Sequence, residues 1–105
     1  MDETLEWIQK WYHAQCNEDW EHTFGVKIDT VDNPGWWVEI DLAETELERF
    51  VLEEPLHKNS EEDWYFIKVE DSKFTASGDP SKLIVLLKRF REIVEAEAQK
   101  NHQEV

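Results

Sequence analysis

The 105-residue sequence is poor in cysteine, in glycine and in long apolar runs. Its one cysteine, Cys16, excludes an intrachain disulfide and fits a reducing compartment. Its three glycines never form a G-x-G arrangement, so the chain has no glycine-rich loop of the kind that cradles phosphate groups. The longest wholly apolar stretch, Leu83 to Leu87, is far too short to span a bilayer.

Basic residues are also scarce, because 11 lysines and arginines stand against 25 acids and give a net charge of -14. This excess repels nucleic acid and anionic membranes, so we expect neither as a partner and favour a basic protein instead. Residues 1–60 alone carry a net charge of -11. The first four residues lack the basic region and apolar run of a secretory signal, so we expect an unexported, cytoplasmic protein.

Aromatic residues are abundant, with six tryptophans, five phenylalanines and two tyrosines. A disordered acidic tail would be poor in aromatic residues, so this composition predicts a folded domain. Tryptophan and tyrosine also anchor protein interfaces. The sequence therefore predicts a folded acidic protein that carries the side chains typical of a binding surface.

Apolar spacing predicts a helix at each end of the chain. Residues 2–16 place three apolar side chains on one stripe: Leu5, Ile8 and Tyr12. Asp79 is predicted as the N-cap of the second helix, with Pro80 at its first position. The apolar stripe of that helix is Leu83, Leu86, Leu87, Phe90 and Val94. We expect residues 99–105 to form a frayed polar tail, which leaves residues 1–98 as one domain.

Between the helices, alternating side chains predict strands. Pro34 and Gly35 indicate a turn between two alternating runs, in which proline presets φ and glycine accepts a positive φ. We predict strands over residues 24–31, 36–42, 50–56, 64–70 and 73–77, with a further turn at 59–62. The predicted fold is an α+β domain with an antiparallel sheet of four to five strands and both helices packed on one sheet face.

The alternation over residues 36–42 predicts which side chains face away from the helices. If Val38, Ile40 and Leu42 point toward the helices, the residues between them point outward. Trp37 would then be exposed between carboxylates, as on a recognition surface. We predict that the partner-binding residues are Trp37, Glu39, Asp41, Asp29, Glu21 and His22. We expect the other tryptophans to be buried or half-buried in the core: Trp7, Trp11, Trp20, Trp36 and Trp64.

The sequence offers weak signals for chemistry at a metal or at a nucleophile. His13, Cys16 and His22 form an H-x2-C-x5-H pattern that matches no common zinc site and lacks a fourth ligand. Cys16 also lacks the positive surroundings that activate a nucleophilic thiolate. With 25 acids in 105 residues, neighbouring carboxylates are most simply a solvated acidic face. We therefore expect no metal site, no catalytic site and no cofactor.

Several segments together resemble the immunity protein 53 family of bacterial polymorphic toxin systems. The resemblance begins at Leu5 and extends to about Phe90. Its most specific elements are a Trp-Glu-His segment, residues 20–22, followed by Asn-Pro-Gly-Trp, residues 33–36. Agreement continues at Val38, Ile40 to Leu42, Asp63-Trp64, Val69 to Asp71, Lys73-Phe74 and Gly78.

The sequence departs from the family pattern at three places. Trp37 stands where the family usually has a small or polar residue, residues 47–59 agree poorly, and the segment after Glu95 is extra. Such departures are expected where specificity for one partner lies in variable surface positions.

The resemblance implies a stoichiometric, non-enzymatic inhibitor that binds the C-terminal toxin domain of a secreted effector and protects the producing cell. The acidic charge favours a basic toxin, such as a nuclease whose cleft accepts a polyanion. Two alternatives stay open from the residues alone. One is a small enzyme that uses Glu21 and His22 beside Trp20, and the other is a general acidic protein-interaction module.

Overall fold

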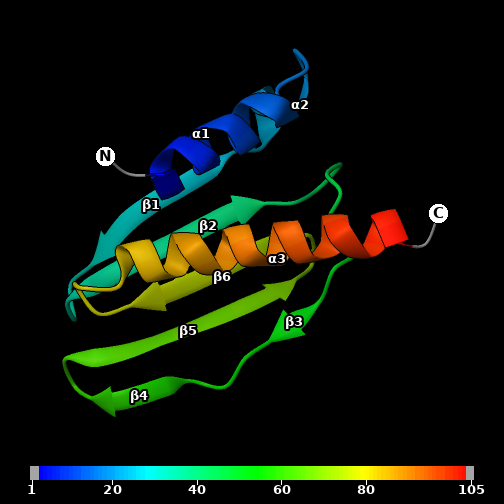
Figure 1. The fold of residues 1–105 in the computed structure, drawn as a ribbon. Coiled ribbons are helices and arrows are strands. Elements are labelled where there is room, and N and C mark those ends of the chain that lie inside the picture. Colours follow the sequence, from blue (N-terminus) through cyan, green and yellow to red (C-terminus); the bar gives the residue numbers. More distant parts are fainter. Residues whose placement is uncertain (1–2, 104–105) are drawn as a thin grey trace.

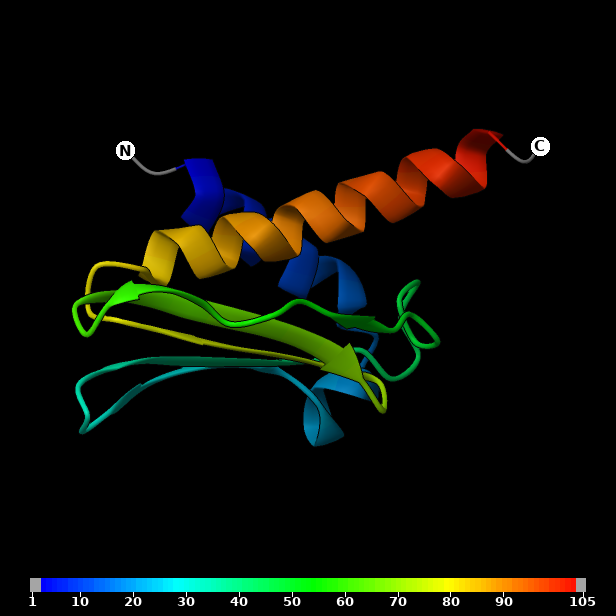
Figure 2. The same cartoon turned by 90° about the horizontal axis from the view of Figure 1, so that it is seen from below.

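Two helices lie on the same face of an antiparallel sheet in the computed structural model, which describes residues 3–103 (Figures 1 and 2). These two helices are α1 (Glu3–Gln15) and α3 (Leu83–Gln103), and a short third helix, α2 (Trp20–Thr23), follows α1. The strands are β1 (Val26–Val31), β2 (Gly35–Asp41), β3 (Leu52–Glu53), β4 (His57–Ser60), β5 (Asp63–Glu70) and β6 (Lys73–Gly78). The α+β class is confirmed, and the described residues form six strands where four or five were predicted.

The sheet has the strand order β1-β2-β6-β5-β3, and β4 also pairs with β5. Its two main hairpins are β1/β2 and β5/β6, and all the pairs are antiparallel. Asp71 and Ser72 turn the second hairpin with φ values of 52° and 60°. Positive φ at both central residues is the requirement of a type I′ turn, whose twist matches that of the flanking strands.

The core lies between the sheet and the helices. Phe90 of α3 is fully buried, and its ring centroid lies 5.0 Å from those of Trp11 and Phe74 and 6.0 Å from that of Trp7. These edge-on contacts join α1, α3 and β6 into one cluster. The predicted inward residues of β2 and the following loop, which are Val38, Ile40 and Leu42, are all fully buried.

Gly35 is required by close packing and not by its backbone angle. The prediction of a positive φ was wrong, since none of the described glycines has one. Gly35 begins β2, and a Cβ atom there would clash with the carbonyl oxygen of Gly78 on β6. Only a residue without a side chain lets these two strands approach so closely.

The edge of the sheet beyond β5 differs most from the predicted strands. The strand predicted over residues 50–56 contains only the two residues of β3, because Pro55 lacks the N–H group that a continuing ladder needs. Residues 59–62 were predicted as a turn, but β4 continues to Ser60 and only Glu61 and Glu62 turn the chain. The short helix α2 was also missed, because four residues are too few to show a period.

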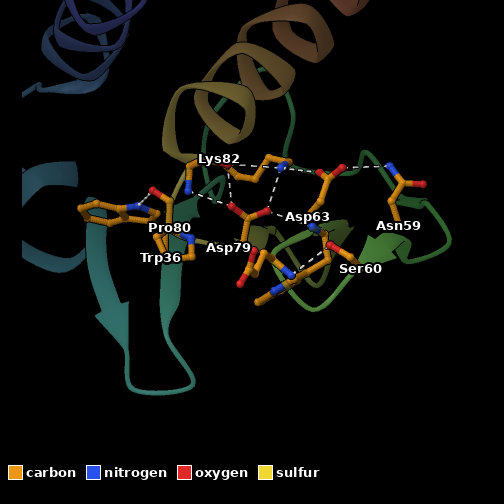
Figure 3. Close-up of polar contacts among 10 residues, drawn as sticks. Trp36, Asn59, Ser60, Asp63, Asp79, Pro80 and Lys82 are labelled. Atoms are coloured by element: carbon orange, nitrogen blue, oxygen red, sulfur yellow. Dashed lines mark hydrogen bonds and ion pairs between the residues drawn. The ribbon is translucent and has the colours of Figure 1, made fainter.

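Asp79 does not cap α3 as predicted, because the helix begins at Leu83. Its buried carboxylate instead organises the turn before the helix (Figure 3). Oδ1 accepts hydrogen bonds from the backbone N–H (2.8 Å) and hydroxyl (2.6 Å) of Ser81. At the other end, α3 continues to Gln103, so it runs through most of the predicted frayed tail; residues 104–105 lie outside the described residues.

The same carboxylate ties the start of α3 to β5. Asp79 Oδ2 accepts a hydrogen bond from the Trp64 N–H (2.8 Å) and lies 2.7 Å from Lys82 Nζ. Lys82 Nζ also lies 2.7 Å from Asp63 Oδ1, so one ammonium group bridges two carboxylates. Burial acts to raise the pKa of Asp79, but the hydrogen bonds from Lys82, Ser81 and Trp64 outweigh it and hold the pKa well below its usual range.

We expect Asp79→Asn to lower the melting temperature at pH 7 by on the order of 10 °C, because the amide cannot pair with the Lys82 ammonium. A lowered folded-state pKa means that Asp79 stabilises the fold above its unfolded pKa of about 3.9 and loses that contribution as the pH falls. The gap between the two proteins should therefore narrow below about pH 4. Thermal unfolding followed by circular dichroism at pH 7 and pH 3 measures this difference in melting temperature. An equal difference at both pH values would contradict the claim that the ionised Asp79 carboxylate stabilises the fold.

Candidate protein-binding site

The sheet face opposite the helices, here called the open face, carries a groove lined by aromatic rings. Trp37 of β2 lies across from Ser77 of β6, which in turn lies across from Phe66 of β5. With Trp64 these side chains line a groove of about 490 Å³, whose other walls include Val31, Leu56 and Lys58. A second hollow of about 500 Å³ continues from Trp37 and Phe66 toward the β5/β6 turn.

Trp37 lies on the open face as predicted, but it is half-buried in the groove wall and not fully exposed. The alternation of β2 places Glu39 and Asp41 on the same face, since Ile40 between them is fully buried. Asp29 of β1 lies directly across from Trp37. Four of the six predicted binding residues are therefore brought to one face by two neighbouring strands.

Lysines on the open face neutralise most of its carboxylates. Lys73 Nζ lies 3.4 Å from Glu39 Oε2 and 3.9 Å from Asp41 Oδ1. Two further pairs, each 2.9 Å apart, join Lys68 to Glu70 and Lys58 to Glu61. The carboxylates beside Trp37 thus belong to ion pairs within the chain, which reduces the negative field at the centre of the groove.

Unpaired carboxylates lie around this centre. Asp29, Glu53 and Asp71 form no ion pair among the described residues. Glu53 and Asp71 line two adjoining hollows that share Phe66 and Lys68, and the exposed Asp29 flanks Trp37. The open face therefore has an aromatic centre, self-paired charges around it and acidic groups at its margin, an arrangement typical of a protein interface with a polar rim.

Glu21 and His22 are not part of this groove. They lie on α2, which precedes the start of β1 at Val26. Trp37 pairs with Asp29, which lies three residues, or about 10 Å, further along β1 than Val26. The structure therefore separates these two predicted residues from Trp37 and Asp29, whereas Asp41 lies at the α2 end of the hairpin, where its carboxylate accepts a hydrogen bond from the Gly25 N–H (3.0 Å).

The alternative catalytic site beside Trp20 lacks the chemistry that it would need. Trp20 is 2 % exposed, and its indole N–H donates to the Ala43 carbonyl oxygen (2.8 Å). The pKa of Glu21 is lowered, first by a hydrogen bond from its own backbone N–H and then by those of neighbouring residues. A general acid at neutral pH needs a raised pKa, so this carboxyl group is poorly suited to that role.

His13, Cys16 and His22 do not converge on a metal. Among residues 3–103, no three histidine, cysteine or acidic side chains are grouped so that they could hold an ion. Cys16 directly follows α1, and its thiol donates a hydrogen bond to the carbonyl oxygen of Tyr12 in that helix (3.4 Å). In the same part of the chain, none of the helices has the length and apolarity needed to cross a bilayer.

Sequence reasoning missed the part of the groove that β5 contributes. Trp64 was assigned to the core, but it is half-buried on the open face, while its neighbour Tyr65 packs against the core. The signal was present, because Trp64, Tyr65, Phe66 and Ile67 are consecutive large apolar residues. Such a run makes both faces of a strand apolar and so predicts a second contact surface beyond the core.

Comparison with known proteins identifies the family. The sequence pattern of the immunity protein 53 family matches residues 5–95, which is most of the chain and includes both the core and the open face. No curated protein and no solved structure gave a significant match. The chain belongs to the immunity protein 53 family.

Proposed function

We propose that this protein binds and neutralises the cognate toxin domain of a bacterial polymorphic toxin system through the open face of its sheet. Membership of the immunity protein 53 family over residues 5–95 is the observation that carries the proposal. The aromatic groove supports it, because a sheet face without a covering layer offers apolar area that only a partner can remove from water. As a stoichiometric inhibitor, the protein acts without turnover, in the cytoplasm of the producing cell.

Aromatic anchors hold the toxin in this proposal. Trp37, Trp64 and Phe66 are rigid rings that take up a partner side chain with little loss of conformational freedom. The ion pairs around them, such as Lys73 with Glu39 and Asp41, form the polar ring that excludes water from the anchors.

Net charge selects a basic toxin. The chain carries a charge of -14, and the unpaired Asp29 on the open face and Glu21 beside His22 on α2 would add acidic groups outside the neutralised centre. Such a field speeds association and rejects acidic partners more than it tightens the final complex. A toxin that acts on nucleic acid carries a positive cleft, so a nuclease is the activity that this charge fits best.

Co-expression tests the proposal directly. The toxin is the C-terminal domain of the protein encoded immediately upstream of this chain's gene, expressed in a host that lacks other immunity genes. Growth arrest by that domain alone and normal growth with both proteins is the expected result. If the toxin arrests growth equally in the presence of this chain, the proposed function is wrong.

Charge reversal on the open face is expected to slow toxin binding. Glu39→Lys and Asp41→Lys should each lower the association rate constant by roughly 3- to 10-fold at low ionic strength, with the effect shrinking as salt rises. Glu92→Lys on α3 is the control, since it changes the net charge equally on the opposite side of the sheet. It breaks one ion pair, as Asp41→Lys does, whereas Glu39→Lys breaks two. Stopped-flow association kinetics measure this, and equal slowing by all three variants would argue against the open face.

A further inference from the structure

The two edges of the sheet differ in how easily they could accept another strand. β1 pairs with β2 over six residues in unbroken register. At the other edge, Pro55 lies between the short strands β3 and β4, and the pairing of β4 with β5 shifts register between Lys58 and Ser60. Short strands, proline and bulges hinder strand addition, so β1 is the edge open to a further strand.

Alternate residues of β1 direct their backbone groups away from the sheet. The Gly25 carbonyl oxygen accepts a hydrogen bond from the Asp41 N–H (3.1 Å), which makes these two residues a hydrogen-bonded pair. The backbone N–H and C=O groups of every second residue from Gly25 onward therefore bond to β2. The backbone groups of the residues between them point away from the sheet, and these residues are Val26, Ile28 and Thr30. The Thr30 N–H is occupied by the Asp29 carboxylate (2.8 Å), so Val26 and Ile28 are the two open positions.

Exposed apolar side chains lie on α1 and on β1. Trp7 packs against Phe90, so that flank of α1 faces α3. Leu5 and Tyr12 lie about 140–160° around the helix from Trp7, on the flank that faces away from α3. They are 48 % and 38 % exposed, and Ile28 of β1, which pairs with the inward-facing Val38, is 41 % exposed. These are three of the five exposed large hydrophobic side chains among the described residues.

We propose that an extended segment of the toxin domain pairs with β1 as an additional strand of the sheet. This inference rests on the proposed function and names the backbone contact through which the toxin is held. The added segment bonds to the N–H and C=O groups of Val26 and Ile28. On the helix side its side chains lie beside the exposed Ile28, so an apolar or aromatic residue fits there.

The charged side chains of β1 indicate which residues of the added strand fit on the open side of the sheet. Side chains of the added strand that face the open side lie beside Asp29, which forms no ion pair among the described residues, so a lysine or arginine fits there. Lys27 also faces the open side, two residues before Asp29, so a basic residue is expected only at the position beside Asp29. A second copy of this chain fits less well, because two bodies of net charge -14 repel each other.

Hydrogen exchange on the unmodified proteins tests the inference. The probe is the C-terminal domain encoded immediately upstream, mixed with this chain at one equivalent, and exchange is followed residue by residue by NMR. The amides of Val26 and Ile28 should exchange within seconds in the free chain and slow at least about 100-fold in the complex.

Each other outcome of this experiment is informative. A stable complex in which both amides still exchange freely overturns strand addition and leaves the proposed function intact. Absence of any complex overturns the proposed function and the inference together. Slow exchange in the free chain at high concentration, with a doubled mass, would show that a second copy occupies the edge and would also overturn the inference.

Proline substitution gives an independent test. Ile28→Pro removes only an outward N–H, which an edge strand tolerates, and should weaken toxin binding at least about 100-fold. Ile28→Thr keeps the N–H and should weaken binding by less than about 10-fold. Glu53→Pro at the other edge is compared with Glu53→Gln, because the Glu54 N–H bonds to the Ile67 carbonyl oxygen and so the Glu53 N–H also points outward. Both variants lose the same carboxylate, so they should bind the toxin equally. Wild-type affinity of a folded Ile28→Pro protein would overturn the inference.

Discussion

Replacing Phe90 by alanine is expected to lower the free energy of unfolding by about 3–5 kcal/mol. The ring is fully buried and contacts Trp7, Trp11 and Phe74, so its removal leaves a cavity at the point where α1, α3 and β6 meet. A domain of this size is stabilised by about 5–15 kcal/mol in total, so the variant should be close to the limit of folding. Urea denaturation followed by tryptophan fluorescence measures the change.

Lys88→Ala is the control for this prediction. Lys88 lies on the same helix but its side chain is exposed, so its replacement should change stability by less than about 0.5 kcal/mol. A loss of under about 1 kcal/mol for Phe90→Ala would mean that the core does not depend on this ring cluster. It would also remove the reason for placing α1 and α3 together on one face.

Replacing Trp37 by alanine is expected to speed dissociation of the toxin by about 30-fold or more, with little effect on the association rate. The indole forms a shared wall of both hollows on the open face, so its loss removes a rigid anchor and opens the groove to water. Trp37→Phe should lie between the wild type and the alanine variant, because part of the ring area is kept. Surface plasmon resonance with immobilised toxin domain gives both rate constants.

Trp7→Ala provides the matched loss of an indole on the other side of the sheet. Trp7 is half-buried against Phe90 and Arg91, so its removal should lower stability but leave the dissociation rate of the folded protein unchanged. Equal dissociation rates for Trp37→Ala and the wild type would show that the groove is not the contact surface. The interface would then have to lie elsewhere, for example at α2.

Strict alternation made β2 predictable. Val38, Ile40 and Leu42 are apolar and separated by other residues, so a period of two assigns each side chain to a face without knowledge of the partner strands. Burial of all three is complete, and Trp37 lies on the opposite face. The stripe of α3 was predictable for the same reason, although Ile93, which the stripe omitted, is also buried.

Contacts between distant residues were not predictable. Asp79 and Pro80 form a standard helix-start pattern, yet Asp79 is drawn into a network with Lys82 and Asp63 that delays the helix to Leu83. Asp63 lies 19 positions from Lys82 in the sequence, so local rules carry no information about this pairing. Similarly, the pairing of Lys73 with Glu39 depends on the alignment of β6 with β2.

Titration of the toxin against this protein tests the central claim most directly. The C-terminal domain encoded upstream is held at fixed concentration, and its activity and the mass of the complex are followed as this chain is added. Activity should fall linearly to zero at one equivalent, with a 1:1 complex that forms more slowly as salt rises. A toxin that stays fully active in excess of this chain, with no complex detected, would contradict the account.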